Sequence, residues 1–259
     1  MRFKDYTVIV TGGGYGIGKE VALAFGREGA NCVLAARSQA KMEAVAAMLR
    51  KLGTKPLVVP MDVGSEEQCA EMVQRALAQY KRIDTLVNNS GIAGPTKLAR
   101  DITHAEWMES MDVNLNGAFY CAKYVSGPMM EAKRGSIVNI SSVAGRIGYA
   151  LRTPYAATKW GMIGLSHSLA AELGPYGIRV NAILPGPVAG ERFDNVVSAR
   201  AKAEGKTFEQ AMEQWVAQVP LRRQVTELEV AEAVTFVASE AASGITGQAF
   251  NVDGGFRMQ

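Results

Sequence analysis

Short runs of apolar, often β-branched residues alternate along the chain with longer stretches in which apolar residues recur at helical spacing. The apolar runs occupy residues 7–12, 31–36, 55–63, 84–89, 135–141, 178–185 and 248–254. Alternation of this kind is typical of a parallel sheet whose strands are joined by crossover helices. The runs are apolar at consecutive positions, which indicates strands buried on both faces. We therefore expect an α/β fold with helices on both sides of one sheet.

Several helical stretches begin with a capping-box spacing, in which serine or threonine is followed three residues later by glutamate or glutamine. The pairs are Ser65 with Gln68, Thr103 with Glu106 and Thr226 with Glu229. No internal repeat appears, and no linker rich in proline, glycine and serine divides the chain. We therefore expect residues 1–259 to form one domain.

One segment departs from the alternation. Residues 187–224 carry mixed charges and amphipathic helical spacing without strand character, between a strand end and the last helix. Our hypothesis is that this segment covers a substrate site at the end of the sheet. The alternative is an ordinary pair of surface helices.

The composition is that of a soluble globular protein, with 48% hydrophobic and 20% charged residues among 259. No apolar run approaches the roughly 20 residues of a membrane span. The start of the sequence lacks the pattern of a signal peptide, so the cytoplasm is the expected compartment. The net charge of +3 is small and scattered, which argues against a nucleic-acid partner.

The cysteines indicate neither a disulfide framework nor a zinc site. Cys32, Cys69 and Cys121 are odd in number, distant from one another, and set in apolar or helical patterns. We expect reduced, structural thiols and no bound metal.

A glycine-rich turn follows the first apolar run and opens a helix. Gly12, Gly16 and Gly18 have the spacing Gly-x-x-x-Gly-x-Gly within TGGGYGIG. Glycines here permit positive φ and a close approach of the backbone to phosphate oxygens, and the helix start adds partial positive charge. In this context the turn predicts a dinucleotide pyrophosphate site. A purely structural tight turn is the alternative.

The end of the second predicted strand bears on the choice between NAD and NADP. An acidic residue about twenty residues beyond the glycines would bind the adenosine ribose of NAD, but the sequence there is Ala35-Ala36-Arg37. Arginine can pair with a 2′-phosphate, so NADP is the expected cofactor and NAD the less favoured one. Tyr15 argues the other way, because a basic residue in the glycine turn would strengthen phosphate binding. Asp62, with Val63, is placed to bind adenine, unless Asp62 only caps a helix.

A third group of residues indicates proton transfer. Tyr155 and Lys159 are four residues apart, so a helix places both on one face. A phenol ionises near pH ~10 in water, and a nearby ammonium favours its anion. Ser142, after the fifth predicted strand, could hold a carbonyl oxygen while Tyr155 gives or takes its proton. This is chemistry for interconverting alcohols and ketones.

These motifs occur in a fixed order along the chain. The glycine turn, Asn88-Asn89-Ser90-Gly91, Asn114, Ser142, Tyr155-x-x-x-Lys159 and Pro185-Gly186 together cover nearly the whole sequence. With them the chain resembles the short-chain dehydrogenase/reductase family. The resemblance implies a single-domain Rossmann-type, doubly wound sheet of seven parallel strands, usually a tetramer, with nicotinamide at the carboxyl ends of the strands.

The resemblance also implies a role for each residue. Tyr155 would be the general acid or base, Lys159 would lower its pKa and hold the nicotinamide ribose, Ser142 would orient the substrate oxygen, and Asn114, in an irregular helix, would complete a proton relay. The residues expected to bind the cofactor are Gly12, Tyr15, Gly16, Ile17, Gly18, Arg37, Asp62, Val63, Asn89, Gly91, Tyr155, Lys159, Pro185, Gly186 and Val188. The family often has threonine near Gly190 to bond the carboxamide, and its lack leaves that role to backbone around Val188. The alternative for Asn114 is a polar residue that satisfies nearby backbone.

We therefore predict an NADP-dependent oxidoreductase that moves hydride between nicotinamide and a carbonyl or secondary alcohol. The alternatives are a 3-oxoacyl thioester reductase, a sugar or polyol dehydrogenase, and a nucleotide-binding sensor or scaffold without turnover. Arginines near the site make an anionic substrate conceivable, although solvated arginines are the simpler interpretation. The candidate substrate residues are Ser142, Arg146, Tyr149, Arg152 and Arg192.

Overall fold

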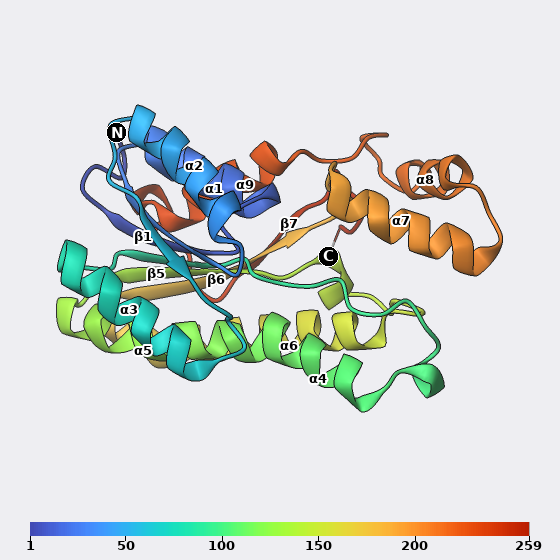
Figure 1. Ribbon diagram of the computed structural model, residues 1–259, viewed down its shortest axis with the longest axis horizontal. Coiled ribbons are helices and arrows are strands. Elements are labelled where there is room, and N and C mark those ends of the chain that lie inside the picture. Colours follow the sequence, from blue (N-terminus) through green and yellow to red (C-terminus); the bar gives the residue numbers. More distant parts are fainter. Residues whose placement is uncertain (259) are drawn as a thin grey trace.

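The computed structural model describes residues 1–258 as one seven-stranded parallel sheet with the order β3-β2-β1-β4-β5-β6-β7 (Figure 1). The strands are β1 (Thr7–Thr11), β2 (Asn31–Ala36), β3 (Leu57–Pro60), β4 (Thr85–Asn88), β5 (Gly135–Ile140), β6 (Ile178–Pro185) and β7 (Ala249–Val252). The order reverses between β1 and β4, so the carboxyl ends of these two strands flank a crevice of the kind that binds ligands in open α/β sheets. The predicted Rossmann-type fold is confirmed.

Helices cover both faces of the sheet. Figure 1 shows α1 (Gly16–Arg27), α2 (Gln39–Lys51) and α9 (Glu227–Ala238) on one face. The other face carries α3 (Glu66–Tyr80), α4 (His104–Met111), α5 (Gly117–Ala132) and α6 (Thr153–Leu173). Each face has its own buried cluster, one around Phe25, Leu34 and Val234 and the other around Met72, Leu86 and Ile137. Burial on both faces explains why the strand sequences are mostly apolar at consecutive positions.

Short irregular helices complete the chain. They are η1 (Ala99–Asp101), η2 (Asp112–Asn116), η3 (Val143–Gly145), η4 (Gly174–Tyr176) and η5 (Glu240–Ala242). Of these, η2 is a π-helix that continues directly into α5. The irregular helix expected around Asn114 is therefore present, and π-helical turns often mark functional sites.

The third strand is shorter than the predicted run of 55–63. Met61 still donates to the Ala36 carbonyl, but the next amide, that of Asp62, donates to the Gln68 side chain (2.8 Å). The Gly64 amide then donates to the Asp62 carboxylate (2.9 Å). The chain thus leaves the sheet to form the start of α3, where Ser65 caps the helix by accepting from the Gln68 amide.

The remaining predicted helix starts are correct. Thr103 with Glu106 and Thr226 with Glu229 form complete capping boxes at α4 and α9. A further capping box, which was not predicted, joins Thr207 to Gln210 at the start of α8 (Phe208–Ala217).

The segment 187–224 forms α7 (Glu191–Glu204) and α8, which extend beyond one end of the sheet in Figure 1. The two helices share a small apolar cluster, in which Val197 and Ala211 are buried and Phe193 and Trp215 pack against them. A parallel bridge between Val188 and Val225 joins the two ends of the segment. Beyond this bridge the segment also packs on the rest of the chain, because Val219 and Trp215 contact Val143 and Phe256.

The three cysteines are free and buried, in agreement with structural thiols. Cys69 and Cys121 meet across α3 and α5 with 3.6 Å between their sulfurs. Within residues 1–258, no cluster of three or more potential ligands suits a metal ion. None of the helices in that range is both long and apolar enough to cross a bilayer.

Candidate active site

A cavity of about 300 Å³ lies at the carboxyl ends of the strands, beneath α7. Fifteen residues predicted from the sequence line it, namely Gly12, Tyr15, Gly16, Ile17, Asn89, Gly91, Ser142, Tyr149, Arg152, Tyr155, Lys159, Pro185, Gly186, Val188 and Arg192. Six predicted residues do not, namely Gly18, Arg37, Asp62, Val63, Asn114 and Arg146. The sheet topology thus gathers most of the predicted site at one edge.

The glycine turn has the backbone that an anion site requires. Gly12 and Gly16 have φ of +66° and +59°, which L side chains rarely adopt. Gly18 packs so tightly that a Cβ would lie 2.3 Å from the Gly12 carbonyl oxygen. Because α1 begins at Gly16, its free amides and partial positive charge face the cavity. These features fit the pyrophosphate of a dinucleotide.

Asn89 fixes the turn from the neighbouring strand. Its side-chain amide donates to the carbonyls of Thr11 (3.0 Å) and Gly12 (3.3 Å). The Thr11 hydroxyl in turn accepts from the backbone amides of Asn89 and Ser90, both at 3.0 Å. These bonds tie the ends of β1 and β4 together across the crevice.

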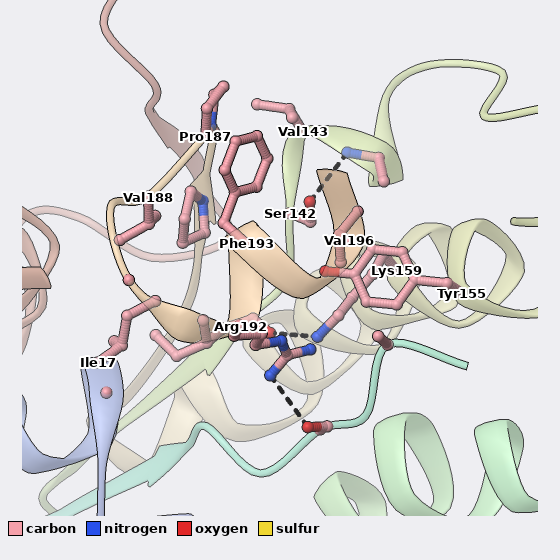
Figure 2. A pocket seen from close by; sticks show the side chains of 18 of the residues that line it. Ile17, Ser142, Val143, Tyr155, Lys159, Pro187, Val188, Arg192, Phe193 and Val196 are labelled. Carbon is pink, nitrogen blue, oxygen red and sulfur yellow. Dashed lines mark hydrogen bonds between the residues drawn. The ribbon is translucent and has the colours of Figure 1, made fainter. Parts of the chain in front are cut away.

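Tyr155 and Lys159 lie on the face of α6 that borders the cavity, and Figure 2 shows both side chains directed into it beside Ser142. The Lys159 nitrogen is 5.7 Å from the centre of the Tyr155 ring. It is anchored by donating to the Ile140 carbonyl at the end of β5 (2.8 Å). Ser142 caps η3 by accepting from the Ala144 amide (3.1 Å), which fixes its hydroxyl at the cavity wall.

The surroundings shift the pKa of both side chains. Burial acts to raise the pKa of Tyr155, but the charges of Lys159 and Arg192 and a hydrogen bond from Ser142 outweigh it, so the pKa lies below its ordinary value. Burial lowers the pKa of Lys159 to about 8, against the opposing effect of Tyr155. At neutral pH the lysine keeps its charge, and the phenol is closer to ionisation than in water.

Asn114 lies behind this pair rather than in the cavity. It is fully buried, and its side-chain oxygen accepts from the Ile92 amide (2.7 Å) while its nitrogen donates to the Ile92 carbonyl (3.1 Å). Its nitrogen also lies 3.3 Å from the Thr158 hydroxyl. Asn114 therefore satisfies the backbone of Ile92 and holds the loop after β4 against α6.

The backbone at Gly190, near which the family often has threonine, leaves little room for a side chain. Gly190 has φ of +140°, and a Cβ would lie 3.1 Å from the Glu227 carboxylate. Glu227, at the start of α9, also lies close to Gly16 and lines the cavity. Burial, followed by the charge of Glu20, raises its pKa. Glu227 was not predicted from the sequence, because only the folded chain brings α9 to the glycine turn.

Outside the main cavity, Arg37 is exposed just past β2. Lys41, which was not predicted, lies near it on α2 with its ammonium 4.9 Å from the centre of the Tyr15 ring. A Cβ on Gly14 would lie 3.2 Å from Cβ of Lys41. A basic side chain of α2 therefore lies beside Tyr15 of the glycine turn.

The three arginines predicted to contact the substrate differ in whether they line the cavity. Arg146 donates to the Ala249 carbonyl (2.8 Å) and does not line the cavity. Arg152 and Arg192 do line it. Arg192 reaches from α7 to donate to the Gly91 carbonyl (3.0 Å), a link that Figure 2 shows crossing beside Lys159.

Aromatic residues complete the cavity wall opposite the glycine turn. Trp215 of α8 packs edge-on against Tyr149 and Phe193, with ring centres 6.0 and 5.6 Å apart. Tyr149 also meets Tyr155 edge-on at 6.5 Å. Phe193 and Trp215 were not predicted, since aromatic residues in an amphipathic helix carry no signal that distinguishes a site from a core.

Comparisons with known proteins show which family and which solved structures the chain is similar to. The family described as Enoyl-(Acyl carrier protein) reductase matches residues 12–257. The 3-oxoacyl-[acyl-carrier-protein] reductase FabG of Staphylococcus aureus is 35% identical over 97% of this chain and 98% of its own. Two solved structures are similar over 98% of this chain. Levodione reductase (33% identity, TM-score 0.93) is covered over 98% of its length, and NAD+-bound xylitol dehydrogenase (30% identity, TM-score 0.96) over 100%.

The lowered pKa of Tyr155 leads to a spectroscopic prediction. In a pH titration followed by the ultraviolet absorbance of tyrosinate, one tyrosine should ionise below the ordinary range, and the step should be absent from Tyr155→Phe. Lys159→Met should move the step to higher pH, because removing the positive charge leaves burial to favour the neutral phenol. Lys51→Met, at the exposed end of α2, is the control and should leave it in place. A low step that persists in Tyr155→Phe would contradict the assignment.

Proposed function

The chain belongs to the short-chain dehydrogenase/reductase family, and we propose that Tyr155 is the general acid and base of its reaction. It is an oxidoreductase that uses a nicotinamide cofactor and interconverts carbonyl groups and alcohols. The observation that carries the assignment to Tyr155 is its place in the cavity beside a buried, anchored lysine.

The nicotinamide, when bound, supplies or accepts the hydride. The glycine turn, Asn89 and Gly91 would hold the dinucleotide, and backbone from Pro185 to Val188 would face the carboxamide. The proton is handled by the chain itself. In reduction the Tyr155 hydroxyl gives its proton to the substrate oxygen and becomes a phenolate, and in oxidation the phenolate takes a proton from the alcohol.

Three neighbours support that transfer. Lys159 stabilises the phenolate through its charge and keeps donors free for the nicotinamide ribose, because its one bond to the chain goes to Ile140. Ser142 presents its hydroxyl to the substrate oxygen from a fixed cap position. Asn114 acts as a positioning residue, since it fastens the loop after β4 to the helix that carries Tyr155 and Lys159.

Removing the phenolic hydroxyl tests this assignment. Tyr155→Phe should lower kcat for ketone reduction by about 10²–10⁴-fold, because it removes the hydroxyl that donates the proton in the proposed mechanism. Binding of the cofactor, measured by quenching of protein fluorescence, should be unchanged. Tyr176→Phe, on exposed η4, is the matched control and should retain full activity. Undiminished turnover by Tyr155→Phe refutes the mechanism.

We propose NADP as the preferred cofactor. Arg37 and Lys41 lie where the adenosine end of the dinucleotide would extend past β2, and β2 ends without an acidic residue. Two cations there suit a 2′-phosphate. One similar structure is titled as NAD+-bound, so the preference rests on these side chains and not on the comparison.

The preference can be measured directly. The wild type should have a higher kcat/KM with NADPH than with NADH. Arg37→Gln should lower kcat/KM for NADPH by about 10- to 100-fold and leave that for NADH within a fewfold, because only the phosphate contact is lost. Arg27→Gln, exposed at the end of α1, controls for a general loss of positive charge. Equal efficiency with the two cofactors, or a preference for NADH, would overturn the proposal.

We further propose that residues 187–224 cover the bound cofactor and substrate. Val188, Phe193, Val196 and Trp215 from this segment line the cavity, and the bond from Arg192 to the Gly91 carbonyl spans it. The segment also has a small apolar core of its own around Val197 and Ala211, as a covering element that moves as a unit requires.

Limited proteolysis tests the covering role. Saturating NADPH should slow thermolysin cleavage within 187–224 by about an order of magnitude, because a closed segment exposes less backbone to the protease. Arg192→Gln should be cleaved faster than the wild type without cofactor, and the fragments can be assigned by mass spectrometry. Cleavage that is indifferent to the cofactor would favour an ordinary pair of surface helices.

Two substrate classes remain candidates alongside a general ketone. Thioesters of 3-oxoacyl groups are favoured by the name of the FabG relative, and sugars or polyols by the xylitol dehydrogenase structure. We also propose a cytoplasmic homotetramer, as the family resemblance implies. Exposed Phe119 and Trp160 on the outer surfaces of α5 and α6 support an assembly surface there.

A further inference from the structure

Arg152 is a buried cation without a matching anion. Its side chain is 4% exposed, and within residues 1–258 no carboxylate forms a salt bridge with it. Among the described residues, its guanidinium donates from Nη2 to the Ala93 carbonyl (2.6 Å), and its Nε has no hydrogen-bond partner. An unpaired buried charge is costly, so such groups are normally paired.

The position of Arg152 ties it to the reaction. Its guanidinium carbon lies 5.2 Å from the centre of the Tyr155 ring and 5.5 Å from that of Tyr149. It lines the main cavity and also an adjoining one of about 370 Å³, which Arg192 shares. The guanidinium therefore lies beside the ring of Tyr155, whose hydroxyl would protonate the reacting oxygen of the substrate.

Other cations gather at the same end of the cavity. Burial lowers the pKa of Arg152 against the opposing effect of Tyr149 and Tyr155, and the charges of Arg192 and Arg200 add to the lowering. Arg200 is already paired with Glu204 (2.8 Å) and lies over the Trp215 ring. Arg192 has only its bond to the Gly91 carbonyl. Glu191 lines the adjoining cavity but forms no ion pair with either arginine among the described residues. The local excess of positive charge thus surrounds the place where a substrate would enter.

We propose that Arg152 binds an oxyanion of the substrate itself, so that this oxidoreductase acts on small ketones or alcohols that carry a carboxylate, sulfonate or phosphonate group. The proposal rests on the function proposed above, because it takes Tyr155 as the group that meets the reacting oxygen. A guanidinium matches such groups through two parallel N–H···O bonds, and Nε–H is the donor left open for this pairing. Arg192 adds a second charge from the covering segment.

A panel of ketones that differ only in charge tests the proposal. Acetoacetate, acetonylsulfonate and acetonylphosphonate are the anionic probes, and methyl acetoacetate and the acetoacetyl thioester of N-acetylcysteamine are the neutral ones. With NADPH as reductant, kcat/KM of the wild type should be at least about tenfold higher for one of the anions than for either neutral probe. The anion with the highest value identifies the headgroup.

Arg152→Gln should lower kcat/KM for that anion by about 100-fold, mainly by raising KM. Its kcat/KM for methyl acetoacetate should stay within about threefold of the wild-type value. Arg152→Lys keeps the charge but lacks the planar guanidinium, so its kcat/KM for that anion should lie between those of the wild type and Arg152→Gln. Arg50→Gln, on exposed α2, is the matched control and should behave as the wild type. Melting temperature and NADPH binding establish that the variants are folded.

Three outcomes overturn the proposal. In the first, the wild type reduces a neutral probe as efficiently as every anion. In the second, Arg152→Gln loses activity toward charged and neutral ketones alike, as a purely structural residue would. In the third, the variant loses affinity for NADPH instead, which would assign Arg152 to a cofactor phosphate. Failure of the proposed function itself looks different, because the wild type would then reduce none of the five ketones.

Discussion

The proton transfer that we propose for this protein depends on keeping the Lys159 ammonium buried beside Tyr155. Burial acts against the charge of the lysine and against the ionised form of the phenol, so either group alone would be driven to its neutral form. Together, each favours the charged form of the other. The bond from Lys159 to the Ile140 carbonyl offsets part of the cost and fixes the ammonium in place. Much of the surrounding architecture maintains this arrangement, from the cap at Ser142 to the buried amide of Asn114.

Much of this could be predicted from the sequence, because the relevant signals are local. Each strand is a continuous apolar run, each predicted cap uses residues three positions apart, and the spacing of Tyr155 and Lys159 fixes their common helix face. The glycine turn is local as well. In an open α/β sheet, topology then places the ends of successive strands at one edge, so residues distant in sequence could be expected to meet.

The parts that could not be predicted depend on contacts between distant segments. Nothing in the sequence around Arg146 and Arg152 shows that one arginine turns toward β7 while the other enters the cavity. Likewise, Glu227 and Lys41 reach the glycine turn only because helices far apart in the sequence pack beside it. The lower wall of the cavity, made of strand ends and α6, was thus predictable. The upper wall, made of α7 and α8, was predicted only as a helical covering segment with Val188 and Arg192 at the site, whereas its aromatic residues Phe193 and Trp215 were not predicted.

The arginines near Tyr155 also bear on the direction of proton transfer. In the free protein their charges favour the phenolate, which is the form that accepts a proton from an alcohol. An oxyanion paired with Arg152 offsets part of that charge and shifts the balance back toward the neutral phenol, the form that donates to a ketone. Binding of an anionic ketone would therefore help to set the protonation state that its own reduction requires. A neutral substrate, which leaves the guanidinium unpaired, has no such effect on Tyr155.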